Sequence, residues 1–175
     1  PDFQRGDENA GGVPSRCSFR WPHALAFWGE RFCVADAGNN RVLVWEEVPQ
    51  SSMQPCDFII GQRDAESVDH NQTSYWPRAD TLNMPYALVN CEGHLLVADT
   101  ANSRLVAYPS AQLGDGGSAI ALNGQPHFQH KGDNQWGALT NTSLCWPYGL
   151  DRHGDVVLVL DSGNNRALLW KRGVT

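Results

Sequence analysis

Three residues whose side chains could take part in chemistry occupy one position of an internal repeat. His23, Tyr86 and Tyr148 each follow a proline that is itself preceded by Trp or Met. An imidazole can bind a metal ion or move a proton near neutral pH, and a phenol can donate and accept hydrogen bonds. A catalytic zinc ion usually takes three protein ligands, so a single histidine does not complete a zinc site. We therefore expect these three residues to line a ligand-binding position.

A second polar set recurs at the same spacing. Each repeat has an Asp at the end of an apolar run and an Arg five residues later, with a segment rich in Asn and small residues between them. Because the pair recurs in every repeat, we expect a turn-stabilising Asp that pairs with Arg across a hairpin, rather than carboxylate catalysis. The sequence has no GxSxG, HExxH or phosphate-loop motif, which favours a protein without catalytic activity. The pairs are Asp36 and Arg41, Asp99 and Arg104, and Asp161 and Arg166.

All these residues belong to a unit that occurs three times, from Trp21, Met84 and Trp146, at intervals of 63 and 62 residues. Each copy predicts a strand after the proline, a turn with Gly, a nearly continuous apolar strand, a hairpin of Gly and Asn, and a third strand rich in β-branched and aromatic residues. A fourth strand is visible twice, at 58–62 and 119–125. Four consecutive antiparallel strands per unit are typical of a propeller blade.

The segments DAGNNRVLVW, DTANSRLVAY and DSGNNRALLW, each at the same distance from a WP or MP dipeptide, resemble the bacterial NHL repeat. Gly61-Gln62 and Gly124-Gln125 fit the end of a blade in that family. The resemblance implies an all-β fold, a β-propeller that is usually six-bladed, with functions from protein and RNA binding to metal-dependent lyase chemistry. In the more weakly similar amidating-lyase propellers, a His after the blade-opening Pro holds zinc in several blades. Here only His23 matches, because Tyr replaces His in the other two blades.

We expect a single partial β-propeller over residues 1–175, with three four-stranded blades at about 17–62, 79–125 and 141–175. Propellers close with about 4–8 blades, so three blades do not make a ring, and they are half of the six-bladed propeller that the resemblance implies. The second half-propeller is expected either from the same longer chain or from a homodimer.

The phase of the repeat at the two ends favours the longer chain. Pro1, Phe3 and Gln4 align with a segment that follows Gly124-Gln125, and the sequence stops at Thr175, soon after a third strand. A self-sufficient half-ring is expected to supply its missing strand at one terminus, and neither end offers one.

Two long connections, residues 63–83 and 126–144, join the blades. They are polar, and loops of this length without evident secondary structure often carry function. Alternatively, they pack over the blade edges. Both interpretations stay open for their aromatic and histidine side chains, which are Tyr75, Trp76, Trp136, His70, His127 and His130.

Composition excludes some partners. The net charge is −6, and the 13 basic residues form no dense cluster, which argues against a nucleic-acid surface. No stretch approaches the roughly 18 consecutive apolar residues of a membrane span, so we expect a soluble, acidic protein without a membrane partner.

The five cysteines are odd in number and contain no CxxC pair, which argues against a zinc knuckle and against a complete disulfide framework. Cys33 aligns with Leu96 and Leu158, so we expect a small buried hydrophobic residue there. The localisation is unknown from the sequence, although free thiols favour a reducing, cytoplasmic compartment.

Two classes of function follow. The regular blades favour a non-catalytic scaffold that binds a protein or small-molecule ligand through its loop face and channel mouth, without a cofactor. The alternative is a metal-dependent lyase-like or hydrolase-like enzyme with its site at the central channel. In that case His23 and histidines of other blades would bind zinc, or the site would take calcium.

Overall fold

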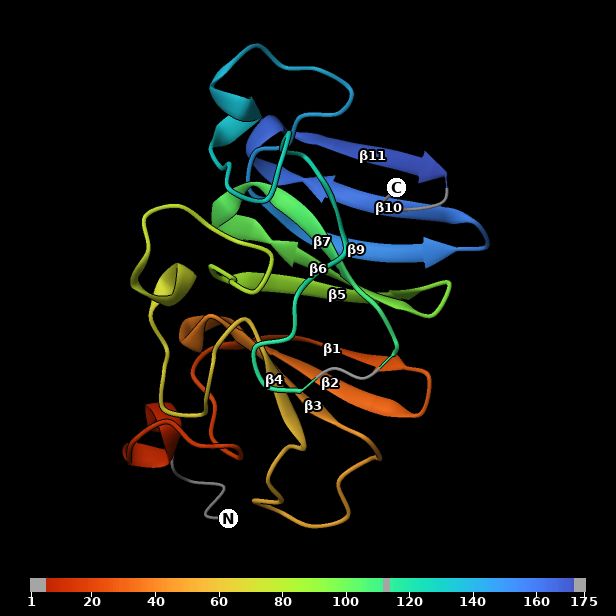
Figure 1. Ribbon diagram of the computed structural model, residues 1–175. Helices are drawn as coiled ribbons and strands as arrows, with labels where there is room; N and C mark the ends of the chain where they lie inside the picture. Colours follow the sequence, from red (N-terminus) through yellow and green to blue (C-terminus); the bar gives the residue numbers. More distant parts are fainter. Residues whose placement is uncertain (1–5, 112–113, 172–175) are drawn as a thin grey trace.

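The computed structural model describes residues 6–111 and 114–171, which form three antiparallel sheets lying side by side (Figure 1). In every sheet the strands are hydrogen-bonded in the order in which they follow one another along the chain. Such a meander is the topology of a propeller blade. The prediction of an all-β propeller with three blades is therefore confirmed.

The strands are short and begin at equivalent residues of the three repeats. The first sheet contains β1 (Pro22–Trp28), β2 (Arg31–Asp36), β3 (Arg41–Trp45) and β4 (Phe58–Ile60). The second contains β5 (Pro85–Cys91), β6 (His94–Asp99), β7 (Arg104–Tyr108) and β8 (Ala121–Asn123). The third contains β9 (Pro147–His153), β10 (Val156–Asp161) and β11 (Arg166–Lys171). Within the described residues the 3-10 turns before and between these strands are η1 (Glu8–Gly11), η2 (Ala37–Asn39), η3 (His70–Thr73), η4 (Thr100–Asn102), η5 (Asp133–Trp136) and η6 (Ser162–Asn164).

The expectation of four strands per blade holds for the first two sheets. Within residues 6–111 and 114–171 the third sheet has three strands, which agrees with a fourth strand being visible only twice in the sequence. The aligned residues Pro1, Phe3 and Gln4 and the chain end at Thr175 lie outside the described residues.

Glycine ends both fourth strands earlier than the sequence predicts. Gly61 and Gly124 adopt φ values of 91° and 93°, in the left-handed region that favours glycine. A Cβ atom on Gly61 would lie 2.7 Å from Cδ1 of Leu82, and one on Gly124 would lie 2.7 Å from Cδ1 of Leu144. The chain therefore leaves the sheet at this position in both blades.

The apolar core lies between neighbouring sheets. One cluster joins the first and second blades and contains Val42, Val97 and Val106, while a second cluster joins the second and third blades through Leu105 and Val159. The strands β6 and β7 of the middle blade are covered on both faces, as their continuous apolar sequences predict. The middle blade therefore shows how each blade packs when it has two neighbours.

The long connections contain a further element of the repeat. Asn71 and Asn134 adopt left-handed φ values of 50° and 52°, and Asn9 does the same at 51° before the first blade. Each of these asparagines exchanges side-chain hydrogen bonds with an asparagine in the hairpin of the blade that follows it, as Asn71 does with the buried Asn102 at 2.9 and 3.1 Å. This part of each connection is therefore fixed to a blade edge.

Candidate functional site

The three residues singled out by the sequence are bulged residues in β1, β5 and β9. In the first blade Pro22 pairs with Asp36 and Ala24 pairs with Ala35, so His23 has no partner in the ladder. The register shifts in the same way at Tyr86 and Tyr148. A bulge leaves one residue unpaired and changes the direction of its side chain, and bulges are frequent beside functional sites. The sequence predicted the strand position of these residues but not the bulge.

The bulged residues form one continuous row of rings. The ring centroids of His23 and Tyr86 lie 3.9 Å apart with planes 10° from parallel, and those of Tyr86 and Tyr148 lie 4.9 Å apart at 58°. His23 and Tyr148 are exposed, whereas Tyr86 between them is partly buried. The three side chains therefore lie side by side, and we call them the inner row.

A tryptophan extends the inner row at the third blade. The Trp146 ring lies nearly parallel to that of Tyr148, at 6.4 Å and 23°. At the other end Trp21 is exposed, and the Arg20 guanidinium lies 5.1 Å from the centre of its ring. The row is therefore a mainly aromatic surface with hydroxyl and imidazole groups along it.

The residue before each blade-opening proline has a strained backbone. Trp21, Met84 and Trp146 have φ values of 49°, 53° and 48°, which residues other than glycine rarely adopt. The preceding blade holds two of them, because the Met84 N–H donates to Oδ1 of Asn40 at 2.8 Å and the Trp146 N–H donates to Oγ of Ser103 at 3.2 Å. These contacts fix the start of the inner strands, and sequence analysis missed them. A usable signal existed, since Asn40 and Ser103 occupy the same position of the repeat.

The electrostatic environment keeps the central tyrosine protonated. Burial raises the pKa of the Tyr86 hydroxyl, and the neighbouring Tyr148 raises it further. Tyr86 can therefore donate a hydrogen bond to a ligand over the whole physiological pH range. Its neighbours offer a second hydroxyl and an imidazole with either donor or acceptor capacity.

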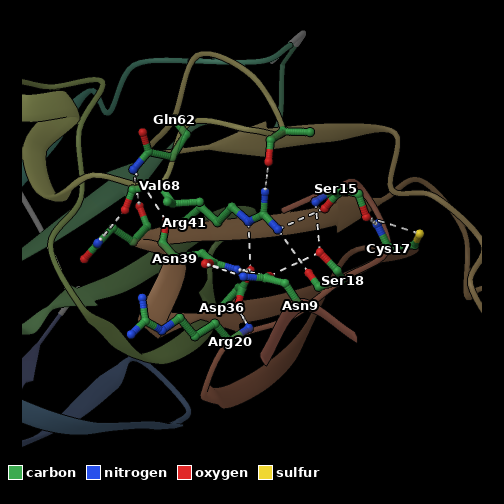
Figure 2. Close-up of polar contacts among 12 residues, drawn as sticks. Asn9, Ser15, Cys17, Ser18, Arg20, Asp36, Asn39, Arg41, Gln62 and Val68 are labelled. Carbon is green, nitrogen blue, oxygen red and sulfur yellow. Dashed lines mark hydrogen bonds and ion pairs between the residues drawn. The ribbon is translucent and has the colours of Figure 1, made fainter. Parts of the chain in front are cut away.

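The recurring Asp and Arg residues are architectural. Arg104 is fully buried, and its Nε donates to Oδ2 of Asp99 at 2.6 Å while its other nitrogens donate to the backbone carbonyls of Arg78, Thr81 and Phe128. Figure 2 shows the equivalent arrangement around Arg41 and Asp36, where the Nε to Oδ2 distance is 2.8 Å. The predicted pairing across the hairpin is confirmed. Sequence analysis did not foresee that the same guanidinium also ties both flanking connections to the blade.

The loop face carries a second aromatic group. Tyr75 and Trp76 pack edge to face at 4.9 Å, and the Nζ atom of Lys131 lies 3.7 Å from the centre of the Tyr75 ring. Trp76 approaches His130 at 6.4 Å, and His130 packs against His127 at 5.5 Å. The predicted loop residues therefore come together, apart from two that lie elsewhere on the connections. Those two are His70 in η3, and Trp136 in η5, whose ring covers Gly132.

In the part of the chain that the structure describes, the histidines and acidic residues do not converge on a metal site. Within residues 6–111 and 114–171, no three His, Cys, Asp or Glu side chains are arranged to hold a metal ion. His23 has two tyrosines rather than histidines as its repeat equivalents, so the inner row of this chain does not fit a catalytic zinc ion. No mechanistic step through a metal follows from these residues.

The cysteines are free thiols, and most are shielded. Cys33 is fully buried, as predicted, and burial raises its pKa to about 12. Burial raises the pKa of Cys145 to about 11.

Among the described residues no helix has the length and apolar character needed to cross a membrane.

A comparison with known protein families identifies an NHL repeat in the first blade. Residues 19–45, which contain β1, β2 and β3, match the NHL repeat family, so the predicted resemblance is confirmed. No curated protein matches the sequence of the chain. The solved structure of the computationally designed Ika4 protein aligns over 97% of this chain and 100% of its own length, with 11% sequence identity and a TM-score of 0.40.

Proposed function

We propose that this chain is a non-catalytic scaffold that binds a protein or a small-molecule ligand at the inner row and over the loop face. The observation that carries the proposal is the contact between the rings of His23, Tyr86 and Tyr148 at three equivalent bulges. Three independent repeats bring a side chain of the same general kind to one place. Ring faces with polar tips are well suited to a ligand that is partly apolar and partly polar.

The inner row favours a small, flat, polar ligand. Its rings supply apolar contact, the hydroxyls of Tyr86 and Tyr148 supply hydrogen bonds, and the exposed ends leave room for approach. The arrangement suits recognition, because within the described residues no hydrogen bond links the His23 imidazole to a hydroxyl of the row, as an activated nucleophile would need. The loop face, with Tyr75, Trp76 and Lys131, offers a separate aromatic and cationic surface for a protein partner.

A titration with a set of small polar aromatic compounds, followed by NMR, tests the proposal. Compounds that bind should shift the ring resonances of His23, Tyr86 and Tyr148. Tyr148→Ala should weaken binding about tenfold, because stacking is worth roughly 1 kcal/mol beyond buried area. Phe27→Ala, at an exposed aromatic residue that belongs to neither surface, is the control and should leave the affinity unchanged.

Two outcomes count against the scaffold. Binding that is insensitive to Tyr148→Ala and to His23→Ala would remove the inner row as the site. Stoichiometric zinc at His23 would instead support the lyase-like or hydrolase-like enzyme, with further histidines supplied by other blades.

A further inference from the structure

The third sheet has an open edge where the other two sheets have a short fourth strand. β11 lies at the end of its sheet, and within residues 6–111 and 114–171 no strand pairs with its outer side (Figure 1). The equivalent strands β3 and β7 pair with β4 and β8. Every residue of β3 and β7 is buried, whereas the residues of β11 alternate between partly buried and exposed. An unpaired strand edge can accept a further extended segment.

A Gly-Gln pair follows each fourth strand and binds the hairpin beside it. The Nε2 of Gln125 donates to the backbone carbonyls of Ser103 at 3.0 Å and Asn102 at 3.3 Å. Figure 2 shows the Gln62 amide at the same place in the first blade. The glycine before each glutamine has a positive φ, which turns the chain from the strand towards the hairpin. The strand and the Gly-Gln pair therefore dock together.

The recurring arginine holds the residues that come next. The Nη1 of Arg41 donates to the carbonyl of Ala65 at 2.6 Å, and the Nη1 of Arg104 donates to the carbonyl of Phe128 at 2.7 Å. Ala65 and Phe128 each lie three residues after the glutamine of their repeat. The fourth strand, the Gly-Gln pair and this carbonyl thus form one docking segment with fixed spacing.

The third blade has the groups that receive such a segment. Asn165 adopts a φ of 54°, the same value as Asn40, so the hairpin has its usual shape. Within the described residues no glutamine reaches the carbonyls of Asn164 and Asn165. Arg166 donates through Nε and Nη2, and in the same part of the chain its Nη1 makes no hydrogen bond. The open strand edge, the hairpin carbonyls and this nitrogen are the three receiving groups of the other blades.

We propose that the outer edge of β11 is the docking site for an extended segment of a partner polypeptide, with three mainly apolar residues followed by Gly-Gln. The segment pairs antiparallel with Ala167, Leu168 and Leu169, in the register that β8 has on β7. Its glutamine amide donates to the hairpin carbonyls, and its carbonyl three residues later accepts from Arg166. The two Gly-Gln pairs of this chain are occupied in their own blades, so a second folded copy does not offer the segment. The site uses no inner-row residue and is independent of the proposed scaffold function.

A synthetic peptide with the sequence of residues 57–65, DFIIGQRDA, and with both ends blocked is the probe. In an NMR titration of the full chain we expect saturable shifts of the backbone amides of Ala167, Leu168 and Leu169, with one peptide bound per chain. The N–H groups of β11 that point away from β10 gain acceptors on binding. Their hydrogen exchange should slow about tenfold when about 90% of the sites are occupied.

Peptide variants test the Gly-Gln pair without any change to the chain. Gln62→Leu in the peptide removes the amide that meets the hairpin, and Gly61→Ala places a methyl group on a residue that needs a positive φ. Each change should weaken binding about tenfold. Arg63→Ala in the peptide is the control and should bind as the original does, because the Arg63 side chain donates to Gln72, which is not in the peptide.

Two arginine variants of the chain locate the site. Arg166→Ala should weaken binding of the original peptide about tenfold. Arg152→Ala changes an exposed arginine on β9, at the opposite edge of the same sheet, and should leave the affinity unchanged. The absence of a saturable response in β11, shifts confined to the first blade, or equal affinity for the Gln62→Leu peptide would overturn the proposal. If Arg166→Ala does not fold, the peptide variants measured on the wild-type chain still decide the question.

Discussion

The arginine of each hairpin joins three segments that are far apart in the sequence. Arg104 connects β7 to the connection before its blade and to the connection after it, through one carboxylate and three carbonyls. Its side chain is fully buried, whereas that of Arg166 at the outer blade is 21% exposed. Arg166 donates to the carboxylate of Asp161 and to the carbonyl of Ser143. Equivalent residues should therefore differ in their contribution to stability.

Removal of these arginines tests that gradient. Arg104→Ala should lower the free energy of unfolding by about 3 kcal/mol, because it leaves a buried carboxylate and three backbone carbonyls without their donor. Arg166→Ala should cost only about 1 kcal/mol. Urea unfolding followed by circular dichroism measures both values. An Arg104→Ala variant with unchanged stability but lost ligand binding would show that the arginine belongs to a site.

The metal content of the purified chain tests the interpretation of His23. With one imidazole and two phenols in the inner row, we expect no stoichiometric zinc after purification without an affinity tag. Elemental analysis measures the zinc content directly. About one tightly bound zinc per chain that disappears in the His23→Ala variant would contradict the expectation and favour the lyase-like alternative.

Residue types made the Asp and Arg pairs and the inner row predictable, because both recur at fixed intervals in the sequence. The bulges were not predictable. The register shift at His23 depends on which residues of β2 pair with Pro22 and Ala24, and residue type does not indicate that pairing.

At the scale of elements, the exit from the fourth strand combines a left-handed backbone conformation with close packing. Gly61 combines a φ of 91° with close contact, since a Cβ atom there would lie 2.7 Å from Leu82 and 3.0 Å from the Asn40 carbonyl. Gly93, in the hairpin between β5 and β6, has a similar φ of 82° but no neighbouring atom within 4 Å of an added Cβ. Gly93 therefore has the backbone constraint alone, whereas Gly61 has both the backbone constraint and a packing constraint.

Alanine substitutions at the two turns should therefore have unequal effects. Gly93→Ala should lower the free energy of unfolding by about 1–2 kcal/mol, because alanine is strained in the left-handed backbone conformation. Gly61→Ala must also displace the buried Leu82, so its total loss of stability should be about 3 kcal/mol or more. Thermal and urea unfolding of both variants give the comparison. Equal losses of stability in the two variants would mean that the connection after β4 moves aside without a cost to accommodate the added methyl group.

The strands were predictable because hydrophobic period and turn residues agree in all three repeats. The connections were not, because their recurring element is a run of residues with positive φ rather than a hydrophobic pattern. Before the second blade these residues are Asn71, Gln72 and Thr73. Asn9 and Asn134 mark the same element, and the surrounding residues differ enough to hide the similarity.

At the scale of the whole molecule, the two outer blades present faces that the middle blade buries. Leu25 is 67% exposed on the first blade, while its equivalent Leu88 is 6% exposed against that blade. Leu169 is 68% exposed on the third blade, while its equivalent Ala107 is 3% exposed. In the middle blade the equivalent residues pack against the two neighbouring blades. Because the blades repeat, the open face of the first blade should pack on a surface like the open face of the third blade.

The blade-to-blade hydrogen bonds indicate how those faces would join. Asn40 and Ser103 hold the N–H groups of Met84 and Trp146 in the following blades. The equivalent residues at the open ends are the exposed Asn165 and the backbone of Trp21. A second half-propeller, from a longer chain or from another copy, would complete this contact twice and would bring two inner rows around one channel.

The mass of the isolated chain in solution tests most directly whether the inner row is half of a shared channel. Sedimentation velocity of the 175-residue chain at micromolar concentration should show twice the 19.3 kDa of one chain, or larger assemblies, because exposed apolar faces of this kind associate. Leu25→Asp and Leu169→Asp should shift the distribution towards the monomer. A folded wild-type chain that stays monomeric and stable at this concentration would contradict the half-ring.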